Sequence, residues 1–199
     1  MIPTTKQELQ KFGTRVVKLA RINLGASKMI EGKKRVTNNS GALSSSLGFQ
    51  LKQKRSSGGK YASGFDLEFT SSMDYAAFME QGVKGSESTK PSAKNSPFKF
   101  KGKNVAKGVI MEWIETKPIR FRDLGTGQFK SRGNTPEQKK SAKKTQAFLI
   151  GRGIATKGLS ARNYFKDAIE KAIPTDGNDV AVAMANDFIK QIIKEIKLN

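Results

Sequence analysis

Glu80 is the carboxylate whose surroundings most strongly suggest chemistry. It lies in the stretch 75-YAAFMEQG-82, among apolar neighbours and just before a glycine. A carboxylate in such a setting can act as a general acid, because an apolar environment holds on to its proton. It can equally pair with a cation or anchor a turn. Glu80 on its own does not decide among these three interpretations.

Asp66 and Glu68 form a second arrangement of carboxylates with a catalytic spacing. They lie two residues apart in an alternating run, so both side chains face the same side of a strand. Together with Asp74 they would be the residues of a small metal-dependent nuclease, which is the enzyme hypothesis to weigh. The simpler interpretation is that Asp66 and Glu68 form the solvated face of a half-buried sheet.

Most other catalytic machinery is excluded by composition. The chain has no histidine and no cysteine, which removes the commonest general base, a Ser–His–Asp triad and thiolate metal sites. The stretch 153-GIATKGLS-160 has the glycine spacing of a phosphate-binding loop, but Leu159 stands where a lysine must reach the phosphates. The sequence therefore predicts a protein that is not an enzyme and needs no cofactor.

Charge is the strongest signal in the composition. Lysine and arginine number 37 against 17 carboxylates, a net charge of +20. Residues 1–60 carry 13 basic and 2 acidic groups, and residues 85–160 carry 17 and 5, whereas residues 161–199 carry 6 of each. This distribution predicts a protein that lies beside a polyanion and keeps a separate neutral surface for packing.

The elements that must position these residues can be read from periodicity. Apolar residues at three- and four-residue spacing predict a helix over 4–30, with Thr4 or Thr5 as its cap. Alternating runs at 47–54 and 61–70 predict a hairpin. Further helices are expected at 40–46, 74–82, 103–116, 136–156, 158–173 and 176–199. The last helix is expected to bury one apolar face, formed by Val180, Ala183, Met184, Phe188, Ile189, Ile192, Ile193 and Ile196.

These elements predict an α+β fold, in which a small antiparallel sheet is packed by an N-terminal and a C-terminal helix. The whole chain, 1–199, is expected to be a single domain, and 83–160 a helical insertion within it. The basic segments 83–101 and 117–145 are expected to act as arms that reach neighbouring subunits. No apolar run is long enough to span a bilayer, and the N-terminus has no signal-peptide core.

Several short motifs occur in an order that resembles one known family. The segment 40-SGALSSSL-47 is similar to a T-G-x-L-x-x-S turn, and 75-YAAFMEQG-82 matches Y-A-x-x-x-E-x-G. An I-x-x-W helix core, an A-x-x-I-x-x-x-I-x-x-x-G helix and a final N-Y-F segment follow. In this order they resemble the neck, or tail-completion, proteins of tailed double-stranded DNA bacteriophages. The residues that carry the resemblance are Gly41, Leu43, Ser46, Tyr75, Ala76, Glu80, Gly82, Trp113, Gly158 and Phe165.

The resemblance implies a structural virion protein, made in the host bacterial cytoplasm and located at the head–tail neck. Members of this family form rings, with twelvefold symmetry favoured and sixfold as the alternative. They join the portal or adaptor side to the tail proteins and surround the DNA channel. The chain departs from the pattern at 81-QGV-83, where the family shows Glu-Phe-Gly-Thr, and in its unusually basic linkers.

Contact with DNA, or with acidic neighbouring proteins, is expected through basic residues near the predicted strands and in the first linker. These residues are Lys33, Lys34, Arg35, Lys52, Lys54, Arg55, Lys101 and Lys103. The alternative function is that of a soluble, non-specific DNA-binding protein, since phosphate contacts need only lysine and arginine.

Overall fold

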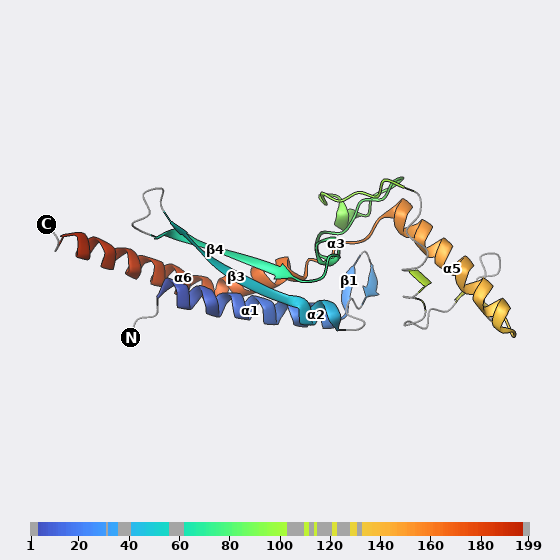
Figure 1. Ribbon diagram of the computed structural model, residues 1–199, viewed down its shortest axis with the longest axis horizontal. Coiled ribbons are helices and arrows are strands. Elements are labelled where there is room, and N and C mark those ends of the chain that lie inside the picture. Colours follow the sequence, from blue (N-terminus) through green and yellow to red (C-terminus); the bar gives the residue numbers. More distant parts are fainter. Residues whose placement is uncertain are drawn as a thin grey trace. The chain divides into compact units, whose positions relative to one another are not determined.

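Figure 1 shows the computed structural model of the chain, which describes residues 4–30, 32–35, 41–55, 62–102, 110–111, 114, 121–122, 128–130 and 133–196. The chain divides into two compact units. Unit 1 consists of Met1–Glu80 and Arg162–Asn199, and unit 2 of Gln81–Ala161. Unit 2 nearly coincides with the insertion expected at 83–160, whereas the single-domain organisation stays a prediction.

Helix α1 (Thr5–Gly25) opens unit 1 with a complete capping box. The Thr4 hydroxyl accepts a hydrogen bond from the Gln7 N–H, and the Gln7 side chain accepts one from the Thr4 N–H at 2.8 Å. The helix ends at Gly25, so the prediction that it continues to residue 30 was wrong. Lys28–Ile30 instead form strand β1, which pairs antiparallel with β2 (Lys33–Arg35).

A β-hairpin follows the short helix α2 (Ala42–Ser46). Strands β3 (Leu47–Arg55) and β4 (Ala62–Ser71) pair antiparallel over their whole length, as the alternating pattern predicted. Phe49 lies opposite Phe69, and both rings pack against the core. The solvated face carries ion pairs from Lys52 to Glu68 at 2.6 Å and from Lys54 to Asp66 at 3.0 Å.

Helix α6 (Tyr164–Ile196) is one continuous helix of 33 residues with Pro174 inside it, although two helices, at 158–173 and 176–199, were predicted. Contacts with α1 hold the helix on both sides of the proline. On the N-terminal side, the Asn23 side-chain amide of α1 donates to the Tyr164 carbonyl at 3.0 Å, and on the C-terminal side Arg15 of α1 forms an ion pair with Asp176 at 2.8 Å. The Thr5 N–H also donates to Asp187 at 2.7 Å. In Figure 1, α6 runs alongside α1.

The core of unit 1 lies where α1, α6 and the hairpin meet. Tyr164 and Leu24 are its largest fully buried side chains. The apolar stripe predicted for α1 is largely confirmed, but Ile22 is 56% exposed. The full set of buried residues is Val16, Val17, Ala20, Leu24, Leu43, Leu47, Ala76, Tyr164, Ala168 and Ala172.

The apolar face predicted for the end of α6 is only partly buried. Ala183 is 2% exposed and contributes to the packing, whereas Met184, Phe188 and Ile189 are all more than half exposed. The side chains of Ile192, Ile193 and Ile196 lie outside the described residues. With its helices at both ends of the chain and its small antiparallel sheet, the protein has the predicted α+β fold.

Unit 2 is built around helix α5 (Pro136–Lys157), which begins with a second capping box, between Thr135 and Gln138. Its inner side packs with Ile110 and Ile114, which belong to the helix predicted at 103–116; most of that helix lies outside the described residues. Short strands β5 (Phe121–Arg122) and β6 (Phe129–Lys130) pair antiparallel in a region predicted to be an irregular connection. A single 3₁₀ turn, Pro91–Ala93, interrupts the linker that precedes them.

Candidate functional site

Glu80 lies at the end of the short helix α3 (Ala76–Gln81) and caps the beginning of α6. Its Oε2 accepts a hydrogen bond from the Phe165 N–H at 3.1 Å, and its Oε1 accepts one from the Lys166 N–H at 3.0 Å. The first N–H groups of a helix have no partner within the helix, and they carry its partial positive charge. A carboxylate is the group that satisfies both requirements.

Asn163 occupies the position from which a helix is usually capped. Its carbonyl accepts from the Asp167 N–H at 2.9 Å, but its backbone has a φ of 51°, in the left-handed region. Backbone bonds hold the turn in place, because the N–H groups of Arg162 and Asn163 donate to Met79 and Glu80 carbonyls. The turn that precedes α6 is thus held by α3, which lies more than 80 residues earlier in the sequence.

Tyr164 and Phe165 complete this junction. The Tyr164 hydroxyl donates to the Ala76 carbonyl at 3.1 Å, and the residue is 2% exposed. The Phe165 ring lies 5.3 Å from the Phe69 ring and 5.1 Å from the Tyr164 ring, centroid to centroid. The stretch 75-YAAFMEQG-82 and the segment 163-NYF-165 therefore form one structural unit, which we call the α3–α6 junction.

The hydrogen bonds of the junction, rather than its electrostatics, favour an anchoring role for Glu80. Burial raises the pKa of the Glu80 carboxyl, while hydrogen bonds from the backbone of Lys166, Phe165 and Tyr164 act in the opposite direction. Burial likewise raises the pKa of the Tyr164 hydroxyl, and the Glu80 charge adds to that effect. Because both Glu80 oxygens already accept backbone hydrogen bonds, its geometry is that of an anchor.

Gly82 and Gly158 lie in unit 2, on either side of a short antiparallel backbone pairing. The Val83 N–H donates to the Leu159 carbonyl at 3.0 Å, and the Leu159 N–H donates back at 2.8 Å. A Cβ atom on Gly82 would lie 2.6 Å from the Leu159 carbonyl oxygen, and one on Gly158 would lie 2.2 Å from that of Val83. Both positions therefore need glycine for close approach, in addition to their positive φ angles.

The motif at 40–47 is also structural. Gly41 precedes α2 with a φ of 80°, and Leu43 is buried in the core of unit 1. The Ser46 hydroxyl lies 2.7 Å from the Ser71 hydroxyl, which links the start of β3 to the end of β4. Tyr75, in contrast, is 43% exposed.

Of the predicted basic contact residues, the structure describes the side chains of Lys52, Lys54 and Lys101. Lys52 and Lys54 pair with carboxylates of the neighbouring strand, and Lys101 is exposed. Lys33, Lys34, Arg35 and Arg55 are strand residues whose side chains lie outside the described part of the chain, as do Lys103 and Trp113 altogether. Sequence reasoning did not single out the exposed lysines of α5, Lys139, Lys140 and Lys144, although their spacing along a predicted helix was visible.

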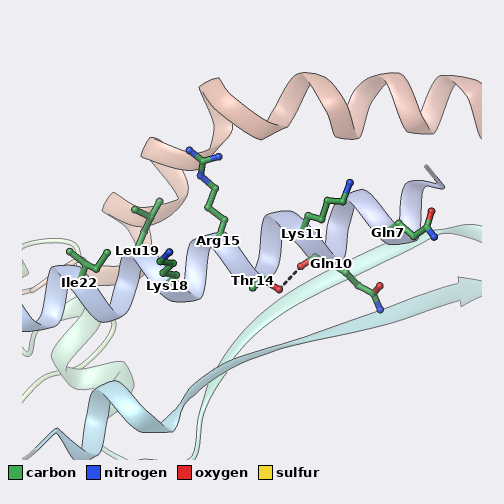
Figure 2. Close-up of a pocket in the computed structure, with 8 residues that line it drawn as sticks. All are labelled: Gln7, Gln10, Lys11, Thr14, Arg15, Lys18, Leu19 and Ile22. Atoms are coloured by element: carbon green, nitrogen blue, oxygen red, sulfur yellow. Dashed lines mark hydrogen bonds between the residues drawn. The ribbon is translucent and has the colours of Figure 1, made fainter. Parts of the chain in front are cut away.

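A groove in unit 1 follows one face of α1 (Figure 2). Arg15 and Lys11 extend from this face toward α6, whereas the Thr14 hydroxyl donates to the Gln10 carbonyl of its own helix at 2.8 Å. Within the described residues, no group of three or more His, Cys, Asp or Glu side chains could hold a metal ion. The residues that line the groove are Gln7, Gln10, Lys11, Thr14, Arg15, Lys18, Leu19 and Ile22.

Comparison with known proteins identifies no relative: no family model, curated protein or solved structure matches the chain. Among the described residues, no helix has the length and apolar character needed to cross a membrane.

Proposed function

We propose that the protein is a structural virion protein that forms a ring at the head–tail junction of a tailed bacteriophage. In this role it joins the portal side to the tail and surrounds the DNA channel. The observation that carries the proposal is the α3–α6 junction. Glu80 and Phe165 belong to two motifs that resemble the neck-protein pattern. They are hydrogen-bonded to each other, and this bond holds α3 against the start of α6.

Two further observations support the proposal. Two of the three acidic residues that could have served a nuclease, Asp66 and Glu68, pair with lysines on the solvated face of the hairpin. Large apolar side chains are exposed on α6, which is typical of a surface that is covered on assembly.

Electron microscopy of the purified protein tests the proposal directly. A ring protein is expected to give negatively stained annular particles, and light scattering is expected to give one mass that is a multiple of 21.8 kDa. The protein should also be detected by mass spectrometry in purified virions of the phage that encodes it. A stable monomer that is absent from those virions would exclude this function.

A second candidate function is non-specific DNA binding, and one observation favours it. Lys139, Lys140 and Lys144 are all exposed on the first turns of α5. Phosphate contacts by such residues release counterions, so the affinity for duplex DNA should fall steeply with salt. Replacing all three lysines with glutamine should reduce that salt dependence, whereas replacing the paired Lys52 and Lys54 should change it less.

A further inference from the structure

The hairpin of unit 1 has two open edges. Within the described residues, its sheet consists of β3 and β4 alone, so each strand has one edge along which no further strand pairs (Figure 1). The strands are long, with nine and ten residues. The backbone N–H and C=O groups of an open edge can pair with another strand, and natural proteins normally keep such edges short or cover them. Both edges are therefore candidate contact surfaces.

The two edges carry opposite charges. Strand β3 contains three basic residues and no carboxylate, whereas β4 contains two carboxylates, Asp66 and Glu68, and no basic residue. On the solvated face of the hairpin, Lys52 lies opposite Asp66, and Gln50 lies opposite Glu68. A basic strand therefore borders one edge of the sheet, and an acidic strand borders the other.

The ion pairs within the hairpin leave both carboxylates accessible. Lys52 binds Oε2 of Glu68, and Lys54 binds Oδ1 of Asp66, but the Glu68 and Asp66 side chains remain 47% and 43% exposed. In an antiparallel sheet, a side chain meets the residues that lie directly and diagonally across on the next strand. A strand added beside β4 would thus bring its own side chains within reach of both carboxylates.

These charges select which edges can meet. Two β3 edges would bring basic side chains together, and two β4 edges would bring carboxylates together; like charges opposite each other on paired strands are destabilising. A β4 edge beside a β3 edge instead sets carboxylates against lysines. The two edges of this hairpin therefore complement each other in charge and in length, which favours a second copy of the chain over an unrelated strand.

We infer that the β4 edge of one copy pairs antiparallel with the β3 edge of the next, so that neighbouring hairpins form one sheet of alternating basic and acidic strands. Main-chain hydrogen bonds hold such an added strand, and its side chains determine which partner fits. The contact is heterologous, because it joins two different edges, and a heterologous contact that closes on itself generates a ring. The inference rests on the proposed ring function and names the element that joins the subunits.

Exchanging charges between copies tests this contact. The acidic variant, Lys52→Glu/Lys54→Glu, places carboxylates on both strands, and the basic variant, Asp66→Lys/Glu68→Lys, places lysines on both. Each variant alone should lose the annular particles and give a mass near 21.8 kDa by light scattering, because like charges then meet at the contact. A 1:1 mixture should restore the particles, because each β4 edge again meets a β3 edge of opposite charge.

Recovery on mixing separates this contact from the ion pairs inside the hairpin, because a second copy cannot restore a pair within one chain. Those pairs are solvent-exposed and contribute little to stability, so the circular dichroism of both variants should match that of wild type.

The matched control is a fourfold variant that combines all four substitutions. It keeps opposite charges inside the hairpin and should form annular particles alone. When it is co-expressed with tagged wild type, however, it should not enter the wild-type particles, because its β4 edge then meets a β3 edge of the same charge. This result does not depend on the folding of the acidic and basic variants.

Annular particles from either the acidic or the basic variant alone would overturn the inference while leaving the proposed function intact. Folded variants that stay dissociated after mixing would overturn it too, as would a fourfold variant that co-purifies with wild type. Open chains of subunits with the same recovery on mixing would support the edge contact and exclude the ring. A wild-type protein that is a stable monomer and is absent from virions would exclude both.

Discussion

The Glu80 carboxylate accepts a hydrogen bond from the backbone N–H of Phe165, 85 residues later in the chain, at a distance of 3.1 Å. A second bond, from Lys166 at 3.0 Å, makes the interaction bidentate. In this way a helix of 33 residues receives its cap from another element. The stability of unit 1 should therefore depend on the Glu80 side chain.

Glu80→Gln should lower the free energy of unfolding by about 1–2 kcal/mol, because one acceptor oxygen is replaced by an amide N–H that faces a backbone N–H. Urea denaturation followed by circular dichroism measures the difference. Glu170→Gln is the matched control, since Glu170 is exposed on α6, the helix that Glu80 caps, and pairs weakly with Lys166 at 4.0 Å. Equal effects of the two substitutions would contradict the capping role.

Stability should also depend on pH through Glu80. Burial raises the folded-state pKa of this carboxyl above its ordinary value of 4.5, so the folded state holds the proton more tightly than the unfolded state. The stabilising contribution is complete below pH 4.5 and is lost as the pH rises through the higher, folded-state pKa. The difference in unfolding free energy between wild type and Glu80→Gln should change with pH across this window. If the two unfolding free energies differed by the same amount from pH 4 to 7, the raised pKa of Glu80 would be ruled out.

The contribution of Asp187 to stability should have the opposite dependence on pH. Hydrogen bonds from Thr5 lower the pKa of the Asp187 carboxyl below 3.8, so its contribution is present above that pH and is lost as the pH falls further. Comparing Asp187→Asn with wild type below pH 4 therefore separates this contribution from that of Glu80.

Tyr164→Phe should cost about 1–2 kcal/mol, because it leaves the buried Ala76 carbonyl without its hydroxyl donor while keeping the ring. Tyr75→Phe removes a hydroxyl from a neighbouring residue that is 43% exposed, and it should have almost no effect. Thermal or chemical unfolding of the two variants gives the comparison. If Tyr75→Phe were the more damaging change, the assignment of the buried hydrogen bond would be wrong.

Gly82→Ala should be more harmful than Gly32→Ala, although both glycines have a φ of 73°. An added Cβ at Gly82 would lie 2.6 Å from the Leu159 carbonyl oxygen, whereas nothing lies within 4 Å of one at Gly32. The shared φ cancels the backbone strain in the comparison, so the difference in unfolding free energy reports the clash alone. Similar losses of stability at the two positions would show that the backbone conformation, and not the clash, sets the cost of adding a Cβ.

Gly13→Ala tests a close approach inside α1. Alanine in the middle of a helix is normally stabilising by about 1 kcal/mol relative to glycine. Here the new Cβ would lie 2.7 Å from the Phe49 ring, so we expect destabilisation instead. The double variant Gly13→Ala/Phe49→Leu should recover part of the loss, because the smaller side chain leaves room.

The sequence predicted the elements whose signals are local. The helix starts at Thr4 and at residue 136 and the alternating strands of the hairpin depend on neighbouring residues, and they form where the pattern indicated. The gap predicted between helices 158–173 and 176–199 does not form, because contacts with α1 hold α6 together across Pro174.

The partners of Glu80 could not be predicted from spacing. From the sequence alone, Glu80 could be a general acid, an ion-pair partner or the anchor of a turn. The choice stayed open because the N–H groups that bind Glu80 belong to a segment more than 80 residues away. Backbone donors carry no sequence signal of their own. The strands β1 and β2 were missed for a related reason, since the lysine-rich stretch that contains them lacks the apolar alternation of a half-buried strand.

The pairing of Val83 with Leu159 has a consequence for the order of folding. Unit 2 spans 81 residues, from Gln81 to Ala161, and α6 can join α3 only when this whole length has been closed into a loop. Closure entropy costs about 0.6 kcal/mol for each doubling of loop length. Once Val83 and Leu159 are bonded, the remaining loop is only a few residues long. Early formation of unit 2 would therefore lower the entropic barrier to assembling unit 1 by about 2 kcal/mol.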